Sequence, residues 1–80
     1  MAELLEWLAR QLVDDPGAVR VEEVEREDAT VLQLYVADAD RGKVIGRSGR
    51  IARALRTVVR AAAARERRRV VLEIVERHAA

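Results

Sequence analysis

The hydrophobic positions in the first half of the chain change from helical spacing to alternation. Over residues 2–13, leucines recur on one face of an amphipathic helix, at Leu4, Leu5, Leu8 and Leu12. Pro16 and Gly17 follow and are expected to stop this helix. Residues 19–26 and 30–37 are rich in valine and leucine, and their short connection predicts an antiparallel β-hairpin. Because Val21 and Val24 break strict alternation, a bulge in the first strand is an alternative to regular pairing.

The second half of the chain returns to helical spacing and ends in a strand. Asp38 and Asp40 are candidate N-caps for a short helix over residues 41–45, which Gly46 would end. Residues 50–64 predict a longer amphipathic helix, with one apolar face and an opposite face made of Arg53, Arg56 and Arg60. A charged loop over residues 65–69 precedes an alternating segment at residues 70–75, which predicts a strand.

These elements predict an α+β fold of order αββααβ, formed as a single domain by residues 1–80. The last strand is expected to lie parallel to the second strand after a crossover, which gives a three-stranded mixed sheet with three helices packed on one face. The chain has one Trp, one Tyr and no Phe, so the core must consist of Val, Leu, Ile and Ala. Trp7, at the margin of the first helix's apolar stripe, is expected at the core edge or on a partner surface.

Several classes of protein are disfavoured by the residues that the chain lacks. It has no cysteine, which excludes disulfides, cysteine-based zinc sites and thiol nucleophiles, and no metal site is expected. The glycines match neither a Walker loop nor a dinucleotide fingerprint, so no cofactor is expected. His78 is expected in solvent, and no nucleophile or carboxylate pair near it in the sequence would give it a catalytic role. We therefore predict that the chain is not an enzyme. Without a signal peptide or a membrane-spanning segment, we expect a cytoplasmic protein.

Charge is strongly segregated along the chain, although the net charge is only +1. Residues 1–40 contain 3 basic and 11 acidic side chains, whereas residues 41–80 contain 12 basic and 3 acidic ones. The two halves therefore carry net charges of −8 and +9. This asymmetry favours a surface that binds a polyanion, and a dipolar protein that pairs its own halves is the alternative.

A glycine motif lies between the two central helices, in the sequence Gly46-Arg47-Ser48-Gly49. Two glycines separated by two residues let the backbone turn sharply and leave it open to an approaching sugar-phosphate strand. The start of the following helix favours a phosphate, and Arg47 and Arg50 add positive charge beside it. A purely steric turn explains such a motif equally well when it stands alone, so its context must decide.

That context resembles a type II KH domain, because the motif follows Val44-Ile45 and stands between the second and third helices of an αββααβ chain. The segment VIGRSGRIARALRTVVRAAA is similar to KhpA, a family of small bacterial single-KH proteins, and the resemblance covers essentially the whole chain. The family more often has lysine and a longer polar residue where this chain has Arg47 and Ser48. The loop at residues 65–69 is also unusually basic.

The resemblance implies a groove for roughly four nucleotides, between the glycine loop and the last strand with its preceding loop. Val44, Ile45 and Ile51 would form an apolar floor for bases. The RNA backbone would be held by the glycine loop itself, Gly46 to Gly49 including Ser48, and by Lys43, Arg47, Arg50 and Arg53. Four arginines of the loop on the far side of the groove could also contact the RNA, namely Arg65, Arg67, Arg68 and Arg69. The alternative is that their charges protect an edge strand from aggregation. The sequence is equally consistent with Arg56 and Arg60 lying on a solvated helix face and with their contacting RNA.

The function implied by the resemblance is binding of single-stranded RNA, as an RNA chaperone or post-transcriptional regulator. The alternative is a protein-interaction module in which the GxxG turn is structural only. KhpA proteins form homodimers or pair with a second KH protein, KhpB, and that pair is linked to cell-envelope growth and cell shape. The family places this contact near the helices around the glycine loop, so dimerisation and RNA binding are expected to share residues and compete. The alanine-rich residues 61–64 would let two helices approach closely.

Overall fold

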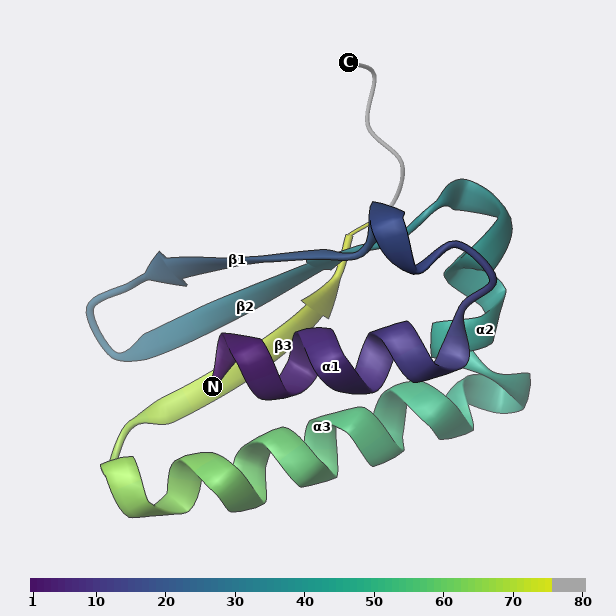
Figure 1. Ribbon diagram of the computed structural model, residues 1–80. Helices are drawn as coiled ribbons and strands as arrows, with labels where there is room; N and C mark the ends of the chain where they lie inside the picture. Colours follow the sequence, from purple (N-terminus) through teal and green to yellow (C-terminus); the bar gives the residue numbers. More distant parts are fainter. Residues whose placement is uncertain (76–80) are drawn as a thin grey trace.

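The computed structural model describes residues 1–75, so His78 lies outside the described residues (Figure 1). The helices are α1 (Ala2–Leu12), α2 (Arg41–Ile45) and α3 (Arg50–Ala63). The strands are β1 (Arg20–Glu25), β2 (Ala29–Tyr35) and β3 (Arg69–Ile74), and four short 3₁₀ turns, η1 to η4, lie in the connections (Pro16–Ala18, Asp38–Asp40, Arg47–Gly49 and Ala64–Glu66). The predicted αββααβ order is confirmed. In the described part of the chain, no helix has the length and apolar character that a membrane crossing requires.

The three strands form one mixed sheet in the order β1-β2-β3. β1 pairs antiparallel with β2, and β2 pairs parallel with β3, as the crossover predicted. Pairing between β1 and β2 is one-to-one from Arg20 with Tyr35 to Glu25 with Thr30, so the alternative of a bulge is wrong. Val21 and Val24 instead lie on opposite faces: Val21 packs against the core, and Val24 pairs with Val31 on the face without helices.

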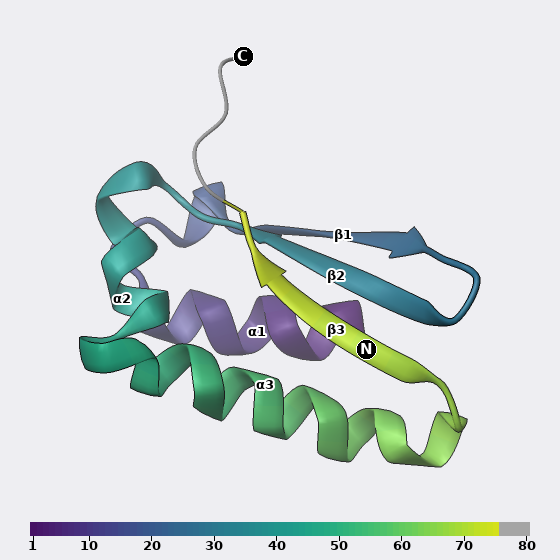
Figure 2. The same cartoon turned by 180° about the vertical axis from the view of Figure 1, so that it is seen from behind.

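All three helices lie on one face of the sheet, as Figures 1 and 2 show from opposite sides. The core between the layers is aliphatic, and its fully buried side chains include Leu5 of α1, Leu32 and Leu34 of β2, and Val59 of α3. Burying each of these side chains contributes about 1.5–3 kcal/mol of hydrophobic free energy. The packing fixes α3 beside β3, and this arrangement positions the site described below.

Asp40 occupies the N-cap position of α2, as predicted, but its side chain makes no capping hydrogen bond to the helix. Its carboxylate is only 2% exposed and accepts a hydrogen bond from the backbone N–H of Asp15, with 3.0 Å between Asp15 N and Asp40 Oδ2. Lys43 Nζ lies 3.9 Å from the other oxygen. Asp38 is the first residue of η2, and its carboxylate accepts a hydrogen bond from the Arg41 guanidinium. The Asp40 carboxylate therefore ties the connection between α1 and β1 to α2.

Candidate nucleic-acid interface

The glycine loop turns the chain between α2 and α3 through backbone conformations that few residues adopt. Gly46 ends α2 with φ 76° and ψ 170°, Ser48 has φ 57°, and Gly49 has φ 76°. The Gly46 N–H donates to the Gly42 carbonyl at 2.8 Å, which closes the short helix. Helix α3 then begins at Arg50.

The two glycines are required for different reasons. At Gly46, a Cβ would lie 2.9 Å from both the Cβ and the backbone nitrogen of Ile51, and nearer still to Cγ1, which leaves no room for a side chain. At Gly49, no atom lies within 4 Å of the position that a Cβ would take, so only the positive φ favours glycine. The backbone at Gly49 is therefore bare and approachable at the start of α3.

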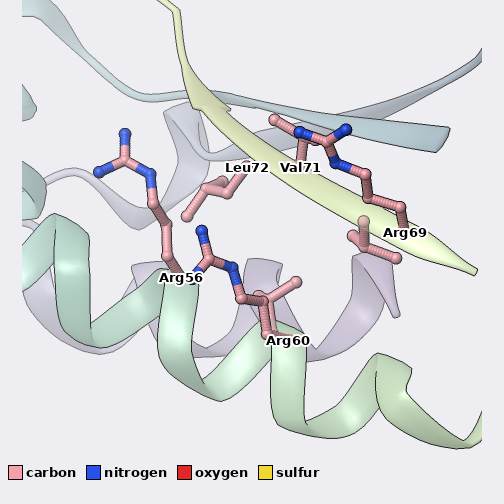
Figure 3. A pocket seen from close by; sticks show the side chains of 7 residues that line it. Arg56, Arg60, Arg69, Val71 and Leu72 are labelled. Carbon is pink, nitrogen blue, oxygen red and sulfur yellow. The ribbon is translucent and has the colours of Figure 1, made fainter.

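A groove runs between α3 and β3 and begins at the glycine loop. Its proximal part has a volume of about 480 Å³ and is lined by residues of α2, α3 and β3, namely Ile45, Gly49, Ala52, Arg56, Val71, Leu72, Glu73 and Ile74. Its distal part, of about 290 Å³, is lined by Arg56, Val59, Arg60, Arg69, Val70, Val71 and Leu72 (Figure 3). The two parts adjoin, because they share Arg56, Val71 and Leu72, and together they are called the α3–β3 groove.

Strand β3 is an edge strand of the sheet, and its outer edge borders this groove. Backbone N–H and C=O groups on such an edge are not paired with a neighbouring strand and are available to a ligand. The proximal part thus combines aliphatic surface from Ile45 and Val71 with backbone polar groups and the guanidinium of Arg56. This mixture suits a ligand that has flat apolar faces, polar edges and negative charge.

The predicted RNA-binding residues fall into two groups around the groove. Ile45, Gly49 and Arg69 line it, while Arg47, Ser48 and Arg50 are exposed on the glycine loop and at the start of α3. Arg53 is exposed on α3 but lines neither part. Within residues 1–75, no ion pair involves Arg47, Arg50 or Arg53, so their charges are not neutralised by this part of the chain.

Three residues expected at the groove lie elsewhere. Val44 is 0% exposed and belongs to the core, so its side chain offers no surface to a base. Ile51 packs against Gly46 and lines an apolar surface between α1 and α3 instead of the groove. Lys43 Nζ lies 3.3 Å from Asp14 Oδ2 and also near Asp40, so its charge is directed to the acidic connection after α1.

Arg68 differs from the other arginines of the loop before β3 because its guanidinium is held by the β-hairpin. Its Nε donates to Thr30 Oγ1 at 2.8 Å, and its Nη2 donates to Glu25 Oε1 at 2.7 Å and to the Arg26 carbonyl at 3.0 Å. These bonds join the far wall of the groove to the tip of the hairpin. Arg68 therefore has a structural role where an RNA contact was expected, while Arg65 and Arg67 remain exposed.

Part of the groove's lining was not predicted from the sequence. Arg56 lines both parts and Arg60 lines the distal part, although a solvated helix face had seemed equally consistent for both. Helical spacing offered a signal, because Gly49, Ala52, Arg56 and Arg60 follow one another every three or four residues along one face of α3. Leu72 and Glu73 line the groove because β3 lies at the edge of the sheet beside α3. The hydrophobic periodicity of the sequence does not reveal this placement.

A glycine turn between two helices, set beside an edge strand in an αββααβ chain, defines a type II KH domain. The chain belongs to the KhpA/KhpB KH-domain family, whose sequence model matches residues 2–74. A relative from Clostridium acetobutylicum is 55% identical over 75 residues, covering 94% of this chain and 100% of the relative. One from Aquifex aeolicus is 49% identical over 76 residues, covering 95% of this chain and 96% of the relative.

Both relatives are named RNA-binding protein KhpA, as is one from Clostridium perfringens that is 53% identical over 75 residues, 94% of this chain and 100% of the relative. The resemblance seen in the sequence and the KH fold are confirmed. The family is not enzymatic, which agrees with the prediction made from the sequence. No solved structure matches the chain.

Proposed function

We propose that this chain binds short single-stranded RNA in the α3–β3 groove, with residues 1–80 acting as a single KH domain. The observation that carries the proposal is the groove itself, which begins at a bare glycine turn and is lined by aliphatic side chains and by arginines that form no ion pair within residues 1–75. Pairing and stacking in double-stranded RNA hide the Watson–Crick edges and the faces of the bases, whereas a single strand exposes both to such a groove. The names of the relatives point in the same direction.

In this proposal the glycine loop holds the RNA backbone and the groove receives the bases. Backbone N–H groups around Gly49 and the positive end of α3 favour a phosphate, and the side chains of Arg47 and Arg50 add two mobile charges. Ile45 and Val71 provide apolar surface for a base, and the edge of β3 provides polar groups. Binding by backbone and charge implies little discrimination between sequences.

Replacing Arg56 by alanine is expected to weaken binding of a short RNA about equally for different base sequences. Arg56 reaches both parts of the groove, and loss of one phosphate contact lowers the slope of log affinity against log salt by about 0.7 for a single strand. Fluorescence anisotropy at several salt concentrations measures both quantities. Arg53→Ala, which removes the same charge from an exposed position on the same helix, is expected to have a smaller effect. A change in base preference at constant slope would contradict the phosphate contact.

A second surface favours self-association. Trp7 and Val58 are 58% and 42% exposed, and with Ala54 they lie in an almost wholly apolar depression of about 350 Å³ between α1 and α3. Exposed apolar patches of this kind mark interaction sites. We therefore propose a homodimer through this surface, or a heterodimer with a KhpB-type protein that uses the same surface.

The apolar surface shares no lining residue with the α3–β3 groove, so we expect a dimer that short RNA does not disrupt. Val58→Glu places a charge in the middle of the surface and is expected to give a monomer that retains its RNA affinity. Sedimentation equilibrium at micromolar concentration, with and without RNA, measures this. A strict monomer in the unmodified chain would remove the dimer, and dissociation by RNA would show that the two surfaces overlap.

The cellular role that fits weakly selective binding of single strands is that of an RNA chaperone or post-transcriptional regulator. Such a role places the protein in the cytoplasm, where bacterial RNA is made. Sequencing the RNA crosslinked to the protein in cells tests this assignment. A set of bound RNAs no different from the total RNA population would argue against regulation of particular transcripts.

A further inference from the structure

The distal part of the α3–β3 groove is a small recess with an apolar floor and three arginines around it. Val59 and Leu72 of the floor are almost fully buried. Figure 3 shows Arg56 and Arg60 extending from α3 towards β3, while Arg69 extends along β3. The arginine side chains thus surround a hollow of about 290 Å³ whose base is hydrocarbon.

The positive charge around this recess is not balanced by the surrounding protein. No carboxylate lines it, and none of the three arginines forms an ion pair with any residue in the described range 1–75. Like charges held around one hollow repel one another, and an anion placed among them relieves that repulsion. A guanidinium also stacks on flat aromatic rings and binds phosphate through two parallel hydrogen bonds.

The recess adjoins the proximal part of the groove, with which it shares Arg56, Val71 and Leu72. Roughly four nucleotides occupy the groove of a KH domain, so a strand leaving the proximal part along β3 would enter the recess next. We propose that the distal recess binds one further nucleotide of the same RNA strand. Its base lies against Val70 and Val71, which line the recess and are only partly buried, and its phosphate lies between Arg60 and Arg69. This inference depends on the proposed RNA-binding function.

The test compares two RNA lengths in several variants by fluorescence anisotropy. Oligoribonucleotides of a single repeated base are used, of about four and about eight nucleotides, so that only the longer one reaches the recess. A longer RNA can bind in more registers, which raises its apparent affinity. This factor is the same for the unmodified chain and each variant, so it cancels when their affinities are compared at one RNA length. Arg60→Ala and Arg69→Ala are each expected to lower affinity for the longer RNA roughly fivefold and to change that for the shorter RNA by less than about twofold. Arg56→Ala is expected to weaken both.

Arg26→Ala is the matched control, because it removes the same charge from an exposed side chain at the hairpin tip, outside the groove. Equal losses at the two lengths in Arg60→Ala and Arg69→Ala, or none at either, would overturn the recess while leaving RNA binding itself in place. Failure of the unmodified chain to bind RNA of either length would overturn the proposed function as well. A different outcome would assign the recess to an acidic protein instead. In that case the unmodified chain would capture a polyglutamate peptide, Arg60→Ala would abolish the capture, and neither variant would show a loss of RNA affinity that depends on length.

Discussion

Replacing Arg47 and Ser48 together by aspartate is expected to abolish binding of short RNA while the fold stays intact. Both side chains are exposed on the glycine loop and pack against none of the core, so their loss removes little stability. Two carboxylates would instead face the phosphates, where like charges repel. Aspartate is also one of the few residues that tolerate the positive φ of 57° found at Ser48. Anisotropy titration of the variant should show a loss of roughly a hundredfold or more, which corresponds to about 2.7 kcal/mol.

The control for this variant is Arg26→Asp, which reverses one charge at the hairpin tip and leaves the glycine loop unchanged. It is expected to retain most of the affinity, because the hairpin tip lies at the opposite end of the molecule from the loop (Figure 1). Circular dichroism should be the same for all three proteins. If the double variant bound short RNA with near-normal affinity, the glycine loop would not be the phosphate-binding element.

Gly46→Ala is expected to be the most destabilising single substitution in the loop, costing about 2–4 kcal/mol of unfolding free energy. Its φ of 76° and ψ of 170° are accessible almost only to glycine, and the new methyl group would overlap Ile51. In a domain of this size that loss lowers Tm by roughly 10 °C or more. Thermal unfolding followed by circular dichroism measures the change.

Gly49→Ala is the comparison variant. Gly49 has the same φ as Gly46, but its ψ of 15° lies in the left-handed helical region and it has open space around it, so the substitution is expected to cost only about 1–2 kcal/mol. In a double-mutant cycle, Ile51→Ala is expected to restore part of the stability lost in Gly46→Ala, because it removes Cγ1, the atom nearest to the new methyl group. The Cβ and the backbone nitrogen of Ile51 stay in place, so the restoration is incomplete. Equal destabilisation by the two glycine substitutions, with no coupling to Ile51, would mean that backbone conformation alone requires Gly46.

Secondary structure and strand pairing were predictable because local patterns are strong in this chain. The end of α2 at Ile45 follows from Gly46, whose positive φ ends the helix. The absence of a bulge was not predictable from β1 alone. Val24 is apolar because it pairs with Val31 on the face of the sheet that has no helices, and this pairing depends on the register with β2.

The site was predictable near the glycine loop and less so away from it. Arg47, Ser48 and Gly49 lie within one turn, so a local motif fixes where they are. Burial of Val44 and the interactions of Lys43 and Arg68 depend on partners distant in sequence, such as Asp14 for Lys43 and Glu25 for Arg68. Residue type shows that an arginine is charged, but only the tertiary structure shows whether a carboxylate already neutralises it.

The order of the strands has a kinetic consequence for the encounter with a polyanion. β1 carries Glu22, Glu23 and Glu25 at one edge of the sheet, while the arginines of α3 and β3 lie at the other edge, with β2 between them. This separation gives the molecule an electric dipole directed across the strands. A diffusing RNA is repelled by the acidic edge and drawn towards the basic one, so the protein is turned into the productive orientation before contact. Association should therefore be faster than random collision allows at low ionic strength, and this advantage should disappear as salt shortens the range of the field.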